Sequence, residues 1–365
     1  MPYTFQQAKA AFMNNQIRGL SLEPTGLRFL KLRSASRRDQ MQRLVAGVGL
    51  ADPGYRGERL LRYLFESNIT EQQIEATIKE IYEEERAGRR DNERELISEL
   101  YRMESFDWGG LHQNSLEKTI VDNYVKKIRS FDQLNDSIEN QLHNSMRSYV
   151  QCSWYNHWTS ILIEDIFRDH ASVLPAVGLI KQIDFFIRGV PFDLKVTYMP
   201  EGYLKAKRKA VGLRPELTIL RQFCRTNDIH FSNDLPDGRL LEDLWKKVND
   251  HPSEEATMLT EGLLRFRAEI VRGCLADPVE LIRWLYENQG VRRFDASNRL
   301  FLILIDQIDY FSSWKLKRAK ALLVERIHNH LDAAGDGTGR DVIFEWEGEQ
   351  YRSTSDAIFV VRNNG

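Results

Sequence analysis

Two aspartates and a lysine lie close together in one short stretch of the chain, residues 183–197. Asp184 stands near its start, and Asp193 and Lys195 follow after eight further residues. Neighbouring carboxylates raise each other's pKa unless a cation balances them, and Mg²⁺ takes one or two protein carboxylates together with water and phosphate oxygens. A lysine beside such a metal can orient or deprotonate an attacking water. These residue types therefore predict metal-assisted hydrolysis of a phosphate ester.

The local pattern predicts a β-hairpin that brings the three side chains together. Apolar, β-rich runs stand on both sides of Arg188 and Gly189, and such runs around a short glycine-containing turn are a hairpin signal. With these two residues as the loop, Asp184 would face Asp193 as a non-hydrogen-bonded pair. Lys195 would project from the same face. The opposite face would carry the alternating apolar side chains Phe192, Leu194 and Val196.

The same spacing also fits an ordinary surface hairpin whose Asp193 and Lys195 face solvent, so the flanking elements have to separate the two interpretations. The order Asp184, eight residues, then Asp193-Leu194-Lys195 between apolar strands resembles the PD-(D/E)xK nuclease superfamily, the fold of many type II restriction endonucleases. The resemblance implies that Asp184 and Asp193 bind the metal and that Lys195 assists the water. Ile183 stands where the motif name has proline, a position that the family often varies.

A helix is expected ahead of the hairpin. Residues 154–170 are apolar on most sides, which predicts a buried helix. In the nuclease family a glutamate on this helix often completes the metal site, and Glu164 matches that role by position. Asp165 falls on the most apolar face of the same helix and competes for the inward position. The sequence leaves the choice between Glu164 and Asp165 open.

The elements after the hairpin also fit the resemblance. Residues 202–214 form a basic cluster, which would hold a DNA backbone through charge or else be a solvated loop. Residues 299–306 read as a buried parallel strand, and 314–331 as a helix. The resulting order of helix, hairpin, helix, buried strand and helix is the order that the nuclease core requires. The candidate DNA-binding residues of the cluster are Lys205, Lys207, Arg208 and Lys209.

We therefore predict an α/β (α+β) chain with a restriction-endonuclease-like mixed sheet core flanked by helices. Residues 1–145 are expected to be a helical region, in which the charged run 83–95 forms a solvated helix face and a break. Residues 146–335 are expected to form the nuclease core, with a helical insertion at about 230–290. A C-terminal β-hairpin is expected in 336–365.

Composition further limits the class of protein to which the chain can belong. The 365 residues suffice for one large or two modest domains, and 42% hydrophobic with 28% charged residues is ordinary for a soluble globular protein. The formal charge of −2 excludes a polycationic tail but not a local basic surface. The three cysteines have no paired spacing, which argues against a zinc site or a disulfide framework. No run of 18 apolar residues occurs, so we expect a cytoplasmic protein without a membrane partner.

The resemblance implies a Mg²⁺-dependent endonuclease that hydrolyses DNA phosphodiester bonds, in the manner of a type II restriction endonuclease. A structure-specific DNA repair nuclease is one alternative. Another is a non-catalytic DNA-binding or scaffold protein that keeps the fold. Because a palindromic site presents two equivalent strands, the resemblance also implies a possible homodimer.

Overall fold

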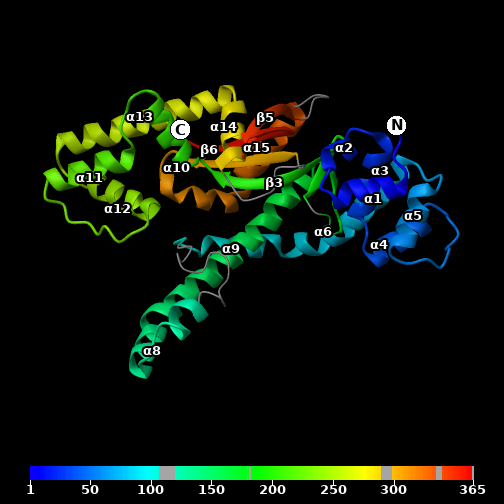
Figure 1. The fold of residues 1–365 in the computed structure, drawn as a ribbon, viewed down its shortest axis with the longest axis horizontal. Coiled ribbons are helices and arrows are strands. Elements are labelled where there is room, and N and C mark those ends of the chain that lie inside the picture. Colours follow the sequence, from blue (N-terminus) through cyan, green and yellow to red (C-terminus); the bar gives the residue numbers. More distant parts are fainter. Residues whose placement is uncertain (107–119, 179, 181, 289–297, 334–338, 364–365) are drawn as a thin grey trace.

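The computed structural model of the chain describes residues 1–106, 120–178, 180, 182–288, 298–333 and 339–363. A six-stranded mixed sheet lies at the centre, helices cover it, and the N-terminal helices form one end of the molecule (Figure 1). The predicted fold class, a mixed sheet flanked by helices with a helical N-terminal region, is confirmed.

The sheet has the strand order β1-β2-β3-β4-β6-β5. Its first three strands pair antiparallel, β3, β4 and β6 run parallel, and β5 pairs antiparallel with β6. Every residue of the central strand β4 is buried, as the continuous apolar run predicts for a parallel strand. The strands are β1 (Val173–Pro175), β2 (Phe185–Ile187), β3 (Val190–Tyr198), β4 (Arg299–Asp306), β5 (Arg340–Trp346) and β6 (Glu349–Arg362).

The hairpin β2–β3 has the predicted loop. Arg188 and Gly189 adopt φ values of 48° and 84°, and two consecutive positive φ angles are the mark of a two-residue type I′ turn. The predicted register is confirmed for its three pairs, Phe185↔Phe192, Phe186↔Pro191 and Ile187↔Val190. The ladder ends there, so the expected ladder pair of Asp184 with Asp193 is wrong, since Asp184 comes just before β2.

The two faces of the sheet have separate cores. Phe192, Leu194 and Val196 pack with the helix that precedes the hairpin, which confirms the apolar face predicted for β3. The other face packs against α10 and α14 through Phe301 and Ile303 of β4. Asp193 and Lys195 alternate with the apolar residues of β3 and therefore belong to this second face.

The N-terminal helices build a core that extends into the sheet. Buried residues of α1 to α6 share one cluster with Leu174 of β1 and Phe186 of β2. Thr70 opens the longest of these helices with a capping box to Gln73. The helices are α1 (Phe5–Met13), α2 (Ile17–Ser21), α3 (Pro24–Ser34), α4 (Arg38–Gly47), α5 (Glu58–Glu66) and α6 (Glu71–Tyr101).

The expected break in the charged run of α6 is wrong, whereas the expected solvated face is confirmed for most of residues 83–95. The helix is continuous through this run, and Arg86 is only 2% exposed. Arg86 Nε donates to Asp169 Oδ1 at 3.0 Å, and Arg89 Nε donates to Asp165 Oδ2 at 2.7 Å. The basic side chains therefore pair with acids about 80 residues further along the chain, which a local charge pattern does not reveal.

The helix expected at residues 154–170 is the C-terminal part of a longer helix, α9 (His143–Arg168), so the expected boundary at 145/146 falls in its first turn. The N-terminal part of α9 projects from the body with α8, as Figure 1 shows. The other elements of this arm are η1 (Val121–Val125), α8 (Phe131–Ser137) and η2 (Ile138–Leu142).

Helices connect β3 to β4, as expected. Three of them, α11, α12 and α13, share a core of their own and form a lobe beside the sheet (Figure 1). After β4 the chain forms the 3-10 helix η3 (Tyr310–Arg318) before α15 (Lys320–Ala333), so the helix expected at 314–331 begins later than predicted. The connecting helices are α10 (Glu201–Ala210), α11 (Glu216–Thr226), α12 (Asp237–Asn249), α13 (Glu254–Ala276) and α14 (Val279–Asn288).

The C-terminal strands β5 and β6 form the expected hairpin and extend the sheet through the parallel pairing of β6 with β4. Among the described residues, no helix is long and apolar enough to cross a membrane.

Candidate functional site

The first candidate acid is fixed where β2 separates from β3. Asp184 N donates to Phe192 O at 2.8 Å, and Asp184 Oδ2 accepts from the backbone N of Leu194 at 2.7 Å. Since the ladder has ended at Phe185, the N–H of Leu194 has no β2 carbonyl opposite it, and the carboxylate satisfies this donor instead. Asp184 is thereby held beside the strand that carries the second acid.

Asp193 and Lys195 lie side by side on β3, as predicted. Lys195 Nζ is 2.6 Å from Asp193 Oδ1, and Arg299 Nε is 3.7 Å from Asp193 Oδ2. Arg299 is the register partner of Asp193 across the parallel β3–β4 pair. Asp193 is buried, whereas the Lys195 side chain is 35% exposed and can reach water.

Asp184 and Asp193 influence each other electrostatically. Burial raises the pKa of Asp184, the hydrogen bond from Leu194 opposes this shift, and the negative charge of Asp193 raises the pKa further. The cations Lys195 and Arg168 act in the opposite direction. Two carboxylates therefore share one partly buried place at the edge of the sheet.

Glu164 approaches this place from α9. Arg168 Nη2 lies 2.7 Å from Glu164 Oε2 and also donates to the backbone oxygen of Asp184 at 3.3 Å. Burial raises the pKa of Glu164; Arg168 opposes the shift, and the charge of Asp184 adds to it. Glu164 is therefore near Asp184 through one shared arginine.

Asp165 lies on another side of α9, within the interface with α6. Its carboxylate accepts two hydrogen bonds from Arg89, both at 2.7 Å, and its side chain is only 2% exposed. Arg86 Nη1 lies 3.6 Å from the same carboxylate. Of the two helix acids, Glu164 shares Arg168 with the backbone of Asp184, and Asp165 joins the helices α6 and α9.

Two arginines of the site were not predicted. Arg168 has a sequence signal, because it follows Glu164 by four residues on a helix and such residues are neighbours. Arg299 has none, since its position depends on the register of two strands more than 100 residues apart.

The candidate DNA-binding cluster forms a helix, α10, and its four basic side chains differ in environment. Lys207 pairs with Glu280, and the buried Arg208 donates to the backbone oxygen of Arg214 at 2.7 Å. Lys205 and Lys209 are exposed. Only these two remain fully available to a phosphate backbone, because α10 turns Arg208 towards the core.

The donor set of the site suits a hard cation. Carboxylate oxygens are preferred ligands of Mg²⁺, which needs only one or two of them beside water and substrate oxygens. A cation between Asp184 and Asp193 would relieve the repulsion that raises the pKa of Asp184. Within the residues that the structure describes, no group of three or more His, Cys, Asp or Glu side chains is arranged to hold a metal ion. The two aspartates are the pair to which the metal would bind, and Glu164 acts electrostatically on Asp184 without forming a three-carboxylate group with the pair.

Comparisons of the chain with known protein families, curated proteins and solved structures found no match.

Proposed function

We propose that the chain is a Mg²⁺-dependent nuclease that hydrolyses phosphodiester bonds in DNA, similar to type II restriction endonucleases. Asp184 and Asp193 would hold the metal, Glu164 would complete its surroundings, and Lys195 would assist the attacking water. The observation that carries the proposal is the placement of Asp184 against β3 by its hydrogen bond to Leu194, next to the Asp193–Lys195 pair.

Bound Mg²⁺ would polarise the phosphate and lower the pKa of water. The residues of the chain supply position and proton transfer. The 2.6 Å contact to Asp193 fixes Lys195 Nζ at the partly exposed mouth of the site, where it can orient a water or take its proton. Lys205 and Lys209 on α10 would contact the phosphate backbone without reading bases. On a palindromic site, a homodimer would present two such sites to the two strands.

One observation favours a second candidate, a non-catalytic DNA-binding protein with the same fold. Lys195 and Arg299 both lie near the Asp193 carboxylate and balance its charge, which is the arrangement of a structural ion pair. A structure-specific repair nuclease would use the same residues on a different DNA substrate. Metal binding therefore separates the enzyme from the non-catalytic protein, and substrate choice separates the two enzymes.

The test combines cleavage with metal binding. Plasmid and branched DNA are incubated with Mg²⁺ and with wild-type protein, Asp193→Ala or the control Asp91→Asn, which changes an exposed acid on α6. We expect the wild type and the control to cut DNA and Asp193→Ala to be inactive. A calorimetric Mg²⁺ titration should give a signal that disappears in Asp184→Ala. Equal cleavage by Asp193→Ala and wild type would overturn the assignment, and Mg²⁺ silence with intact DNA binding would support the non-catalytic protein.

A further inference from the structure

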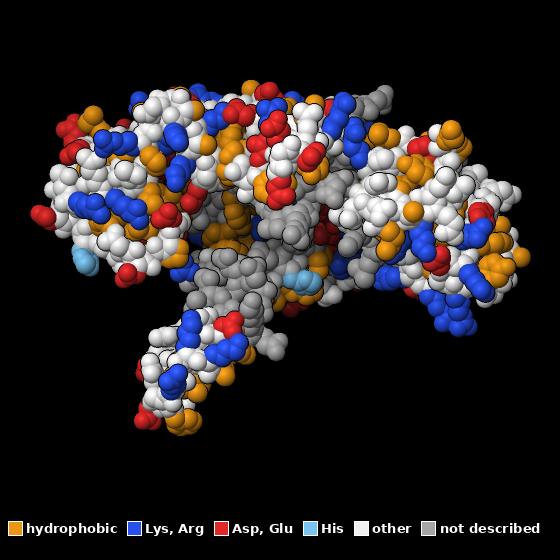
Figure 2. Space-filling view, in the orientation of Figure 1, with side chains coloured by type: hydrophobic (Ala, Val, Ile, Leu, Met, Phe, Trp, Pro, Cys, Tyr) orange, Lys and Arg blue, Asp and Glu red, His pale blue; other side chains and the backbone are white. Residues whose placement is uncertain are grey.

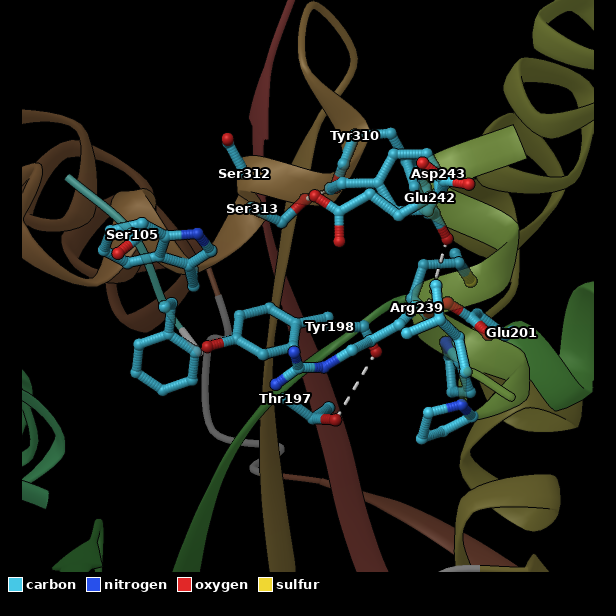
Figure 3. A pocket seen from close by; sticks show the side chains of 18 of the residues that line it. Ser105, Thr197, Tyr198, Glu201, Arg239, Glu242, Asp243, Tyr310, Ser312 and Ser313 are labelled. Atoms are coloured by element: carbon cyan, nitrogen blue, oxygen red, sulfur yellow. Dashed lines mark hydrogen bonds between the residues drawn. The ribbon is translucent and has the colours of Figure 1, made fainter. Parts of the chain in front are cut away.

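A second candidate site lies at the carboxyl ends of β3 and β4. It is a cleft of about 1030 Å³ between the end of β3, η3 and the start of α12. Figure 2 shows the hollow between the α11–α13 lobe and the rest of the molecule, and Figure 3 shows the side chains that line the cleft. Ligands of open α/β sheets commonly bind at the carboxyl ends of the strands. The volume is at the upper end of the range of roughly 300–1,000 Å³ that is usual for small-molecule sites.

The charged residues that line the cleft are mostly acidic. Arg239 is the base among them, and the acids are Glu104, Glu201, Glu242 and Asp243. Asp243 pairs with Lys247 at 2.7 Å. In the described part of the chain, neither Glu201 nor Glu242 has an ion-pair partner.

The surroundings of Glu201 and Glu242 raise the pKa of both side chains. Removal of solvent by the walls of the cleft raises the pKa of Glu201, Arg267 opposes this, and the charges of Glu216 and Glu242 add to it. Loss of solvent likewise raises the pKa of Glu242, with a further contribution from Asp309, whereas Arg239 and Lys246 oppose the shift. Both side chains are nevertheless accessible from the cleft. The cleft therefore holds negative charge that a positively charged ligand would balance.

Aromatic rings form much of the remaining wall. The rings come from Phe106, Tyr198, Tyr310, Phe311 and Trp314. One of them already contacts a cation of the protein itself, because the Arg267 guanidinium lies 3.9 Å from the centre of the Tyr310 ring. Glu216 pairs with Arg267 through a 3.0 Å hydrogen bond, so Glu201 shares the charge of this cation with Glu216.

Tyr198 contributes its ring, and not its hydroxyl, to the cleft. Its hydroxyl oxygen is buried and has no hydrogen-bond partner among the residues that the structure describes. Figure 3 shows the Tyr198 ring in the middle of the cleft, with Ser105 on one side and Glu201 on the other. Lys317 lies 5.5 Å from this ring but outside the lining of the cleft, and its Nζ donates to Asn156.

We propose that this cleft binds a small organic cation with an alkyl body and amine groups, such as a diamine or a polyamine. Its amines would lie against Glu201 and Glu242, and its hydrocarbon chain would lie along the aromatic wall. The same carboxylates would repel a nucleotide or a phosphate, so the cleft is not an extension of a DNA-binding surface. The proposal is independent of the proposed nuclease function.

The test is a calorimetric titration of the full chain with putrescine, a linear diamine, and with butanediol, its uncharged analogue, in the absence of metal and DNA. We expect saturable one-site binding of putrescine and none of butanediol. Glu201→Gln and Glu242→Gln should each weaken putrescine binding by about tenfold or more, the usual effect of losing a hydrogen bond to a charged group. The control Glu255→Gln changes an exposed acid of α13 outside the lining and should leave the affinity unchanged.

The proposal is overturned by absence of saturable putrescine binding, by equal binding of butanediol, or by equal affinity in Glu201→Gln, Glu242→Gln and wild type. Because no step uses DNA or Mg²⁺, none of these outcomes depends on nuclease activity.

Discussion

The carboxylate of Asp184 accepts a 2.7 Å hydrogen bond from the backbone N–H of Leu194, one residue after Asp193. This contact fixes the first acid against the strand of the second, at a place where burial disfavours its charge. Active sites often lower stability in this way, because the same groups must be ready for a ligand that is absent from the free protein. The relationship makes a prediction about stability that needs no substrate.

Asp184→Asn should stabilise the metal-free protein at neutral pH. Burial and Asp193 raise the pKa of Asp184 in the folded state, so this group makes stability fall as pH rises from its unfolded-state pKa through its folded-state pKa. Asparagine can accept the same hydrogen bond from Leu194 without the charge. We expect a gain of about 0.5–2 kcal/mol in the free energy of unfolding. Urea unfolding over a pH series measures it.

The gain from Asp184→Asn should shrink at acidic pH, where the wild-type carboxyl is protonated and uncharged as well. Asp91→Asn, an exposed change on α6, should show no such pH dependence. A loss of stability in Asp184→Asn at neutral pH that disappears at acidic pH would mean that the charge of Asp184 supports the fold.

Glu164 and Asp165 are adjacent in sequence, but loss of their charges should have different effects on stability and on DNA cleavage. Asp165→Asn removes a negative charge that balances Arg86 in the buried α6–α9 interface. It also weakens the two hydrogen bonds with Arg89. Breaking a buried ion pair costs about 3–5 kcal/mol, and we expect the lower end because Arg89 is partly exposed. Glu164→Gln should change stability little but abolish DNA cleavage under the proposed function. Urea unfolding and a plasmid assay measure both variants.

If Glu164→Gln proves strongly destabilising while Asp165→Asn remains stable and loses cleavage, the two roles are reversed. Glu325→Gln, an exposed acid on α15, serves as the control for the loss of one negative charge and should behave as the wild type.

Local sequence patterns predicted the parts of the fold that depend on neighbouring residues. Arg188-Gly189 between two apolar runs was enough to predict the hairpin register, because a two-residue loop and a buried face leave one pairing. The apolar run of β4 predicted its burial, because a parallel strand that is covered on both faces carries apolar residues throughout. Asp184 is outside the ladder, because its side chain and not its backbone accepts the hydrogen bond from Leu194 N. The periodicity of the sequence does not show whether a side chain or a backbone group makes such a bond.

Contacts between distant segments could not be predicted. The charged run of α6 has the composition of a solvated helix, and only the tertiary arrangement brings Asp165 and Asp169 against Arg86 and Arg89. The same applies to Glu164, since the choice between it and Asp165 depended on which face of α9 meets α6. Arg299 reaches Asp193 through the β3–β4 register alone.

Gly189→Ala tests the turn that sets this register. A Cβ at Gly189 would have room, since its nearest neighbour is Leu27 Cδ2 at 3.6 Å, but the φ of 84° is unfavourable for alanine. We expect a loss of about 1–2 kcal/mol in the free energy of unfolding. Gly88→Ala in the interior of α6 would place its Cβ with no atom within 4 Å and should stabilise by about 0.5–1 kcal/mol. Equal effects of the two substitutions on thermal or urea unfolding would contradict the type I′ turn.

Lys195→Met separates a chemical role of the lysine from a structural one. Methionine keeps most of the length of the side chain but removes the ammonium group that lies 2.6 Å from Asp193. Arg299 remains near the carboxylate at 3.7 Å, so Asp193 keeps one cationic neighbour. Because the Lys195 ammonium group no longer competes with Mg²⁺ for the carboxylate, Asp193 should bind Mg²⁺ as tightly as in the wild type or more tightly. Cleavage at saturating Mg²⁺ should fall by roughly 10²–10⁴-fold, the usual contribution of proton transfer by a positioned group.

The two measurements, a calorimetric Mg²⁺ titration and a cleavage rate on the same preparation, give three distinct results for Lys195→Met. Retained metal binding with slow cleavage supports Lys195 as the residue that assists the water. Loss of both would make Lys195 a positioning residue for Asp193, because the metal site would then depend on the ion pair. Undiminished cleavage would remove Lys195 from the reaction and transfer proton movement to another group near the metal, of which Glu164 is the nearest candidate through Arg168 and Asp184.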